Sequence, residues 1–463
     1  MVLPKWQEWY MIKMMKMCVE KVGTGMTIQL PEKVKYIINT LERAGYEAYA
    51  VGGCVRDSIL GRCPDDWDIT TSAKPLEVKA LFRRTIDTGI QHGTVTVMLE
   101  KEGFEVTTYR IDGEYEDSRH PKEVTFTASL REDLMRRDFT INAMAYNDRC
   151  GLVDEFDGIG DLEEKKIRCV GNAVERFTED ALRMMRAVRF SAQLGFEIEE
   201  DTRVAIRKLA PNLKNVSAER IQVELVKLAV SPHPEYLRRA YETGITEVIL
   251  PEFDRAMETK QNHPHHKYCV GEHILHSMRA IASDKVLRLT MLFHDLGKIQ
   301  TRTTDEEGRD HFKGHGEVGA RMAGEILSRL KFDNDTKEKV VKLVRYHDCK
   351  IEESAPAVRR AANKIGTELL WMLFAVKRAD VAAQSGYKME EKLSTLDKLE
   401  ELYTEIEKRQ ECLTLKDLAI TGKDLIQAGM QPGKELGEVL ARLLELVLEN
   451  PECNTKEYLL SQI

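Results

Sequence analysis

Two aspartates, Asp66 and Asp68, stand two positions apart in a stretch of extended character. Side chains alternate between the faces of an extended chain, so both carboxylates point to one side while Trp67 packs on the other. Two negative charges this close repel each other unless a cation lies between them. Carboxylate oxygens suit Mg²⁺, which also takes phosphate oxygens of a substrate. The pair therefore predicts a Mg²⁺ site for phosphoryl chemistry, against the alternative of a solvated acidic loop.

A candidate phosphate site precedes this pair. Gly52 and Gly53 follow the apolar run 48–51, which is typical of a buried strand, and they permit a tight turn and close backbone approach. Residues 55–60 have helical periodicity, so free N–H groups and the guanidinium of Arg56 would face an anion. An ordinary structural turn explains two glycines equally well. The aspartates that follow favour metal-assisted transfer of a nucleotidyl group.

Three motifs follow one another along the chain: GGCVRD at 52–57, DWDIT at 66–70 and RRDFTINA at 136–143. Their order resembles the polymerase-β-type nucleotidyltransferases, specifically the bacterial class II tRNA nucleotidyltransferases and poly(A) polymerases. The resemblance covers most of the chain. It implies that Gly53 and Arg56 hold a triphosphate and that Asp66 and Asp68 bind the catalytic metals.

A third carboxylate is expected from the segment that follows. Residues 94–99 and 104–110 predict the two strands of a hairpin, and Glu105 on the second strand could reach the two aspartates. A glutamate on an exposed strand face is more often solvated. The resemblance favours the other reading, because the family carries its third carboxylate on this strand. By the same resemblance, Arg137 contacts the nucleotide.

The charged segment 110–123 is expected to be a mobile surface loop. By resemblance, Arg110 and Asp112 at its start help to select a ribonucleotide through its sugar. The family also implies that this loop remains intact in enzymes that add the terminal adenosine.

A polar stripe is predicted on the next informative helix, where every third residue is charged: Asp180, Arg183, Arg186 and Arg189. Such a stripe is usually a solvated face. The Asp180 carboxylate accepts and the Arg183 guanidinium donates, which complements the Watson–Crick edges of cytosine and adenine, whereas uracil and guanine present the inverse pattern. These residues match the protein template by which the family selects C and A. Residues 219–224 are expected to brace this helix.

A second set of metal-binding residue types lies in the C-terminal half. His294 and Asp295 are adjacent and offer a nitrogen and an oxygen ligand at one point on a helix. A lone histidine on an apolar face is more often a core residue, but the order of this set resembles the HD phosphohydrolase domain. That resemblance implies four principal ligands and two for a second metal: His273, His294, Asp295 and Asp380, with His315 and His347. A divalent transition metal there would activate water to hydrolyse a phosphoester whose identity the sequence leaves open.

Length and composition set the frame for these sites. The chain has 463 residues, enough for roughly three domains. Its net charge is −8, but residues 165–227 carry 13 Lys and Arg against 9 Asp and Glu, so a phosphate-binding surface is expected there. Nine scattered cysteines without a CxxC pair argue against a disulfide framework or a zinc ribbon and favour the reducing cytoplasm. No apolar run approaches the ~18 to 20 residues of a membrane helix.

We predict an α+β fold, in which a small mixed-sheet nucleotidyltransferase head precedes an all-α neck, body, HD domain and tail. The expected parts are an extension at 1–26, the head at 27–150, a nucleotide- and RNA-binding neck and body at 151–262, the HD domain at 263–390 and a tRNA-binding tail at 391–463. The implied activity is template-independent, two-metal addition of C, C and A to the 3′ end of tRNA from CTP and ATP, with release of pyrophosphate.

Other functions remain open at this point. Within the class, the alternatives are a partial enzyme that adds only CC or only A, or a poly(A) polymerase. An alternative from another class is an HD phosphohydrolase whose head merely binds nucleotide. A third is an RNA-binding module with both sites vestigial, which is disfavoured because neither set of carboxylates is broken.

Overall fold

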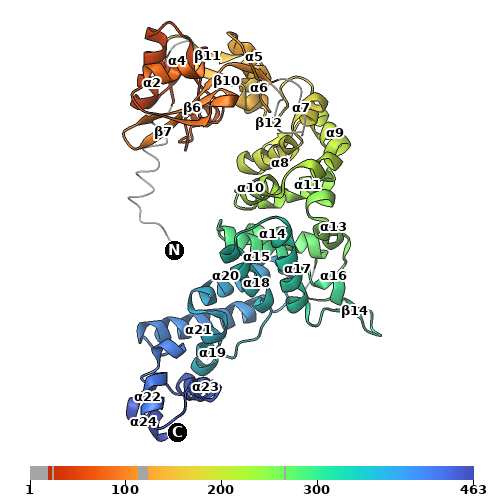
Figure 1. The fold of residues 1–463 in the computed structure, drawn as a ribbon. Helices are drawn as coiled ribbons and strands as arrows, with labels where there is room; N and C mark the ends of the chain where they lie inside the picture. Colours follow the sequence, from red (N-terminus) through yellow and green to blue (C-terminus); the bar gives the residue numbers. More distant parts are fainter. Residues whose placement is uncertain (1–18, 23–24, 113–123, 265–266) are drawn as a thin grey trace. The chain divides into compact units, whose positions relative to one another are not determined.

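The computed structural model of the chain describes residues 19–22, 25–112, 124–264 and 267–463 (Figure 1). Most of the loop predicted at 110–123 and most of the extension predicted at 1–26 lie outside these residues. The first residues of that predicted loop, Arg110–Asp112, form a strand instead. Contacts divide the chain into two compact units, Met1–Glu224 with Arg239–Ile249 and Leu225–Arg238 with Leu250–Ile463. The five-part division expected from the sequence is finer than these units and stays a prediction.

The first unit contains a mixed seven-stranded sheet. Its strands are β3 (Ala48–Val51), β4 (Ile69–Thr71), β5 (Thr85–Gly89), β6 (Thr94–Leu99), β7 (Glu102–Thr108), β10 (Met144–Asn147) and β11 (Gly151–Asp154). Their order is β11-β10-β3-β4-β7-β6-β5, with β4 and β7 parallel and the other neighbours antiparallel. All residues of the central strands β3 and β4 are buried, as apolar and threonine side chains permit. This sheet confirms the α+β fold class.

The hairpin of β6 and β7 differs from the expected one at its second strand. Leu99 pairs with Glu102, so the turn consists of Glu100 and Lys101 alone, and Glu100 has a φ of 58°. The second strand is therefore Glu102–Thr108 and not 104–110. The left-handed conformation of Glu100 closes the turn two residues early.

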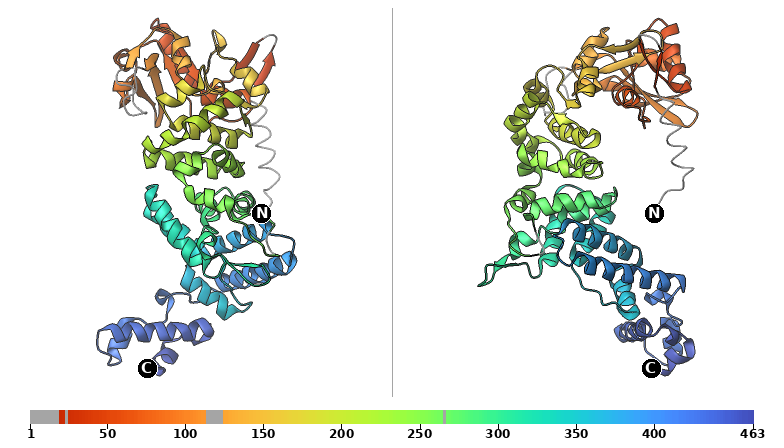
Figure 2. Two further views of the ribbon diagram at one scale, coloured as in Figure 1. Left: turned by 90° about the vertical axis from the view of Figure 1, so that its right-hand side faces the viewer. Right: turned by 180° about the vertical axis from the view of Figure 1, so that it is seen from behind.

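The remaining strands form two-stranded pairs: β1 (Val19–Val22) with β2 (Gly25–Ile28), β8 (Arg110–Asp112) with β9 (Val124–Phe126), β12 (Lys166–Ile167) with β13 (Glu197–Ile198), and β14 (Thr303–Thr304) with β15 (Asp310–His311). The strands of the large sheet belong to the red-to-yellow part of the ribbon, and later residues are almost entirely helical (Figure 2).

Helices accompany the sheet and continue beyond it. They are α2 (Glu32–Arg43), α3 (Gly53–Ile59), α4 (Pro75–Leu81), α5 (Leu130–Met135), α6 (Gly158–Glu163), α7 (Ala173–Glu179), α8 (Leu182–Leu194), α9 (Glu200–Leu209), α10 (Ala218–Ala229), α11 (Leu237–Glu242) and α12 (Ile245–Ile249). Helix α2 buries Val34, Ile37, Ile38 and Leu41, whose spacing of three and four residues places them on one face. Helix α3 follows β3 directly after Gly52, as the glycine pair predicts.

The predicted arginine helix begins later than expected. Helix α7 ends at Glu179, Asp180 is extended with φ −141° and ψ 102°, and α8 begins at Leu182. Asp180 therefore precedes the helix, and its carboxylate accepts from the backbone N–H of Leu182 at 3.0 Å. Aspartate favours such a capping position because its short side chain bonds to free backbone N–H groups.

The second unit is helical. Its helices are α13 (Pro251–Glu258), α14 (Val270–Ala280), α15 (Lys285–Phe293), α16 (Lys298–Thr301), α17 (His315–Arg329), α18 (Asn334–Tyr346), α19 (Ala355–Ile365), α20 (Thr367–Ala383), α21 (Met389–Lys408), α22 (Gly422–Gln427), α23 (Lys434–Glu449) and α24 (Lys456–Ser461). Helices α14, α15, α17, α18 and α20 pack on one another. A further core joins α19, α20, α21 and α23 through residues such as Leu370, Tyr403 and Leu443.

Two findings bear on the environment expected from the sequence. Among the described residues, no helix is both long and apolar enough to cross a membrane. The cysteines of the described ranges are free thiols, and several, such as Cys54 and Cys169, are buried.

Candidate active site and metal centre

The three predicted head carboxylates line one pocket of ≈ 840 Å³. Asp68 directly precedes β4, and its carbonyl accepts from the N–H of Val51 at 3.0 Å, so β3 fixes its backbone. Strand β7 pairs with β4 in parallel with Ile69 opposite Val106, and this register places Glu105 across from Asp68. The side chains of Asp66, Asp68 and Glu105 are all exposed. The sheet thus brings the predicted set together.

The carboxylates influence one another electrostatically. Although solvent reaches Asp68 at the pocket, the protein atoms around its carboxylate partly desolvate it and raise its pKa; the positive charge of Arg137 lowers this pKa, and the negative charge of Asp66 raises it. Partial desolvation likewise raises the pKa of Glu105, and both aspartates add to this effect. Mutual repulsion of this kind is relieved by a cation. The donor set fits Mg²⁺, which binds one or two carboxylates and completes its shell with water and substrate phosphate oxygens.

A glycine turn and an arginine lie beside these carboxylates. Gly52 has a φ of 83°, and a Cβ there would lie 2.9 Å from Nη1 of Arg137, so this position requires glycine. The Nε atom of Arg137 is buried without a hydrogen-bond partner. Arg137 therefore packs on the turn with donor capacity to spare, which is the placement expected of a nucleotide contact.

Arg56 occupies a more enclosed position than the sequence suggested. It is 8% exposed, and its Nη1 donates to Oδ1 of Asn142 at 2.6 Å. Its guanidinium also pairs with Asp57 and lies 5.1 Å from the ring centre of Phe190. Gly53 is the first residue of α3 and is half-buried. Their contact with a triphosphate stays a prediction, and so does the role of Asp112, the last residue of β8.

The predicted stripe is largely buried rather than solvated. Arg183 and Arg189 are 9% and 6% exposed. Arg183 donates to Oε2 of Glu179 at 2.7 Å and to the carbonyl of Arg136 at 3.0 Å. Arg189 pairs with Glu224 at 2.5 Å. Buried arginines of this kind hold the segments around them in place.

Asp180 and Arg186 each form an ion pair with a residue at least 40 positions away in the chain. Asp180 Oδ2 lies 2.6 Å from Nη2 of Arg220, and Arg186 Nη2 lies 2.6 Å from Oδ2 of Asp138. Arg220 thus pairs with Asp180 just before α8, and Glu224 pairs with Arg189 within α8. These two ion pairs confirm that residues 219–224 brace the arginine helix. The base-reading role of Asp180 with Arg183 stays a prediction.

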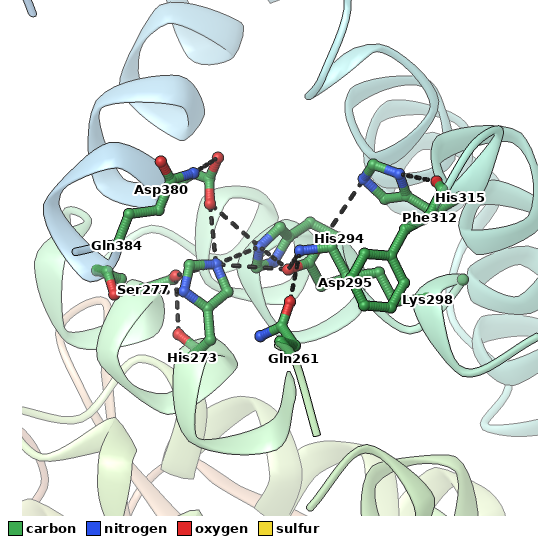
Figure 3. Close-up of polar contacts among 12 residues, drawn as sticks. Gln261, His273, Ser277, His294, Asp295, Lys298, Phe312, His315, Asp380 and Gln384 are labelled. Atoms are coloured by element: carbon green, nitrogen blue, oxygen red, sulfur yellow. Dashed lines mark hydrogen bonds and ion pairs between the residues drawn. The ribbon is translucent and has the colours of Figure 1, made fainter. Parts of the chain in front are cut away.

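Four histidines of the second unit gather around Asp295, and Figure 3 labels three of them: His273, His294 and His315. The Nδ1 atoms of His294, His315 and His347 lie 2.8, 2.8 and 2.7 Å from the carbonyls of residues 291, 312 and 344. Nδ1 of His273 faces the carbonyl of residue 383 at 3.4 Å. A carbonyl only accepts, so each Nδ1 carries the proton and each Nε2 keeps a lone pair for a ligand.

Asp295 lies between two histidine pairs. Its Oδ2 is 3.4 Å from Nε2 of His273 and of His294, and its Oδ1 is 3.6 Å from Nε2 of His315 and of His347. The ligand atoms of each trio, Asp295 with either pair, lie within 4.8 Å of one another, and all are buried. One carboxylate therefore serves two candidate metal positions.

Asp380 lies beside the first candidate position, and its role as a ligand there stays a prediction. Its Oδ1 is 2.9 Å from Nε2 of His273 and 3.8 Å from Nε2 of His294. Burial by itself lowers the pKa of His294, but Asp295 and Asp380 outweigh it and raise the pKa to about 10. The carboxylates thus favour a positive charge at this position, which is either a proton on Nε2 of His294 when no metal is bound or a divalent transition metal held by the Nε2 lone pair. Imidazole and carboxylate groups are ligands that suit such a metal.

Some functional candidates were not found from the sequence. Lys298 Nζ lies 2.7 Å from Oδ2 of Asp295 and 2.9 Å from Oε1 of Gln261, and the lysine is buried. In the head, Asp133 forms an ion pair with Arg136, and Asp138 forms one with Arg186. The signal was available for Lys298, which lies three residues after Asp295 in the chain. Asp295 itself lies in the turn between α15 and α16 and His294 caps the end of α15, so, contrary to expectation, the two do not lie within a helix.

Family models match three parts of the chain. Residues 48–168 match the poly A polymerase head domain, 195–257 match the RNA and SrmB-binding site of polymerase A, and 317–463 match domain 2 of tRNA nucleotidyltransferase. The fold and these matches define the class as nucleotidyltransferases, which act with divalent metal ions.

Full-length relatives give the family. The CCA-adding enzyme of Levilactobacillus brevis is 36% identical over 433 residues, 93% of this chain and 97% of that protein. The CCA-adding enzyme of Lactiplantibacillus plantarum is 56% identical over 209 residues, 44% of this chain and about half, 51%, of that protein. The crystal structure of the Bacillus stearothermophilus CCA-adding enzyme in complex with CTP has a TM-score of 0.72 and 30% identity, covering 94% of this chain and 97% of that one. The chain belongs to the CCA-adding enzyme family.

Proposed function

We propose that the chain adds C, C and A to the 3′ end of tRNA, using CTP and ATP without a nucleic-acid template and releasing pyrophosphate. The observation that carries this function is the head pocket, where Asp66, Asp68 and Glu105 lie beside the Gly52 turn and Arg137. The match to a CCA-adding enzyme over 93% of this chain supports the same activity.

The residues of this pocket have separate roles in the proposed reaction. Asp66, Asp68 and Glu105 hold Mg²⁺, which when bound supplies charge neutralisation at the attacking and leaving oxygens. The glycine turn lets the backbone approach the triphosphate closely, and Arg137 and Arg56 place positive charge beside it. Asp180 and Arg183 read the base edge. The transfer step then requires that the tRNA 3′ hydroxyl be held in line with the phosphorus it attacks and the pyrophosphate that leaves.

The experiment is extension of a tRNA that lacks its 3′ terminal CCA, with each nucleotide alone and in combination. Extension that stops after CC, or that starts only from a tRNA ending in CC, would identify one of the partial enzymes. An unlimited run of A would identify a poly(A) polymerase. The tRNA is proposed to lie along the basic residues 165–227 and the helical tail, and the reducing cytoplasm stays the proposed location.

A second function rests on the histidine centre, which we propose is a divalent metal site that hydrolyses a phosphoester. It opens into a pocket of ≈ 790 Å³ that Asp295, His315, His347 and Asp380 share with five lysines: Lys298, Lys313, Lys350, Lys388 and Lys392. The same lining contains Asp310, Asp348 and Glu391, so the lysines offset the carboxylates, and the metals would supply the excess positive charge that favours an anionic substrate. The test is hydrolysis of 2′,3′-cyclic phosphate ends by wild type and by His294→Ala, with nucleotide addition as the control that His294→Ala keeps.

A further inference from the structure

Asp133 is a fully buried carboxylate in the short helix α5, with 0% of its surface exposed. Its Oδ2 accepts from the hydroxyl of Thr70 at 3.0 Å, and its Oδ1 accepts from the backbone N–H of Arg110 at 3.4 Å. Nε and Nη2 of Arg136 donate to Oδ1 at 3.0 and 2.8 Å. The Nη2 atom of Arg137 lies 3.6 Å from Oδ2. One carboxylate thus joins strand β4, strand β8 and two consecutive arginines.

Two of these partners, Thr70 and Arg137, lie close to the head carboxylates: Thr70 follows Asp68 in the chain, and the charge of Arg137 acts on Asp68. Thr70 lies in β4, two residues after Asp68, so the Thr70 bond ties Asp133 to the strand that directly follows a predicted metal ligand. Arg137 packs against the Gly52 turn and keeps its Nε atom without a partner. Asp133 therefore lies between the aspartate strand and the arginine that faces the turn.

We propose that Asp133 is a positioning residue for nucleotidyl transfer, which holds the guanidinium of Arg137 over the glycine turn where the nucleotide triphosphate binds. An arginine side chain has many rotamers, and holding it before substrate arrives removes an ordering cost from binding. A planar guanidinium also recognises phosphate only in the correct orientation. This inference rests on the proposed nucleotide addition.

The plain alternative is that Asp133 only ties α5 to the sheet. The two roles differ in whether the effect of Asp133 passes through Arg137. A double-mutant cycle separates the two roles. If Asp133 acts through Arg137, the second substitution adds no further loss of activity, whereas the losses add if the two residues act independently.

The experiment measures kcat and KM for CTP and ATP with a tRNA lacking CCA, for wild type, Asp133→Asn, Arg137→Ala and the double variant. Asp133→Asn keeps the shape of the side chain, and we expect KM for both nucleotides to rise by about tenfold while KM for tRNA is unchanged. The double variant is expected to match Arg137→Ala. Asp133→Glu, which moves the charge by one methylene, serves if Asp133→Asn does not fold, with the same expected rise.

Asp161→Asn is the matched control. Asp161 is also a buried head aspartate, 3% exposed, which accepts from the hydroxyl of Thr140 at 2.6 Å and from Nε of Arg168 at 3.1 Å. We expect it to lower Tm without changing KM for nucleotides. Additive losses in the double variant, or an equal rise in KM for Asp161→Asn, would overturn the role of Asp133. A wild-type protein that extends no tRNA would instead remove the proposed function itself.

Discussion

Nε2 of His315 lies 3.1 Å from Nε2 of His347, and the Nδ1 of each ring faces a backbone carbonyl. With the protons fixed on Nδ1, the two Nε2 lone pairs point at each other, which is repulsive unless a cation lies between them. His273 and His294 repeat the arrangement at 3.3 Å. Asp295 is the carboxylate between the two pairs, so the geometry fits two neighbouring metal ions.

The metal content of variants should reflect two separate metal positions that share Asp295. In His347→Ala the position made by Asp295, His315 and His347 loses a ligand, and we expect the transition-metal content to fall by about one ion per chain, with the other position kept. Asp295→Asn should remove both ions, because its two oxygens serve both positions. The measurement is elemental analysis after equilibration with Mn²⁺ and gel filtration. Equal loss in both variants would show that the positions are not separate.

Asp68→Asn should abolish nucleotide addition while tRNA binding remains. Loss of a metal ligand at the reacting phosphate is expected to lower kcat by at least about a thousandfold, equivalent to roughly 4 kcal/mol of barrier. The same holds for Asp66→Asn. Asp65, which lines the same pocket, provides the control, since Asp65→Asn should stay close to wild-type activity. Near-normal incorporation by either metal-ligand variant would disprove the assignment.

Asp138 should make the free energy of unfolding depend on pH in the acidic range. Burial by itself raises its pKa, but the guanidiniums of Arg186 and Arg183 outweigh this and lower the pKa to about 2 from the ordinary 3.8. The folded chain therefore holds the ionised form, and a contribution of roughly 2 kcal/mol is present above the ordinary pKa and lost as the pH falls through about 2. Urea unfolding of wild type and Asp138→Asn should differ by at least this amount at about pH 7, still by roughly half of it near pH 3, and converge only at about pH 2 and below. A difference that is independent of pH would contradict the ion pair.

Asp180→Ala should reduce the use of CTP and ATP more than that of UTP and GTP. An unmade buried hydrogen bond costs about 1 to 3 kcal/mol, so kcat/KM for CTP and ATP should fall roughly tenfold to a hundredfold. Arg220→Gln removes the 2.6 Å partner of Asp180 but leaves its carboxylate, and it should preserve the preference for C and A. The measurement is kcat/KM for all four nucleotides on tRNA ending at the discriminator base and in CC. A uniform decrease for Asp180→Ala would mean that Asp180 only braces the helix.

The sequence predicts a residue's role well where the role follows from residue type and local spacing. Asp66 and Asp68 are two positions apart on an extended chain and so share a face, and adjacent His294 and Asp295 offer mixed ligands, so their assembly could be predicted. The pairing of Asp138 with Arg186, 48 positions apart, is set by tertiary packing and leaves no local signal. The start of α8 was misplaced because an acidic residue at Asp180 fits a helical period as well as a cap, and only its bond to Leu182 decides between them.

The most direct test is incubation of the purified protein with Mg²⁺ and a tRNA transcript that ends at the discriminator base. With CTP and ATP together, we predict that the transcript gains C, C and A and that extension then stops. CTP alone should give CC, and UTP and GTP should give little product. Failure to extend the transcript with CTP and ATP, or continued addition beyond the terminal A, would contradict the proposed function.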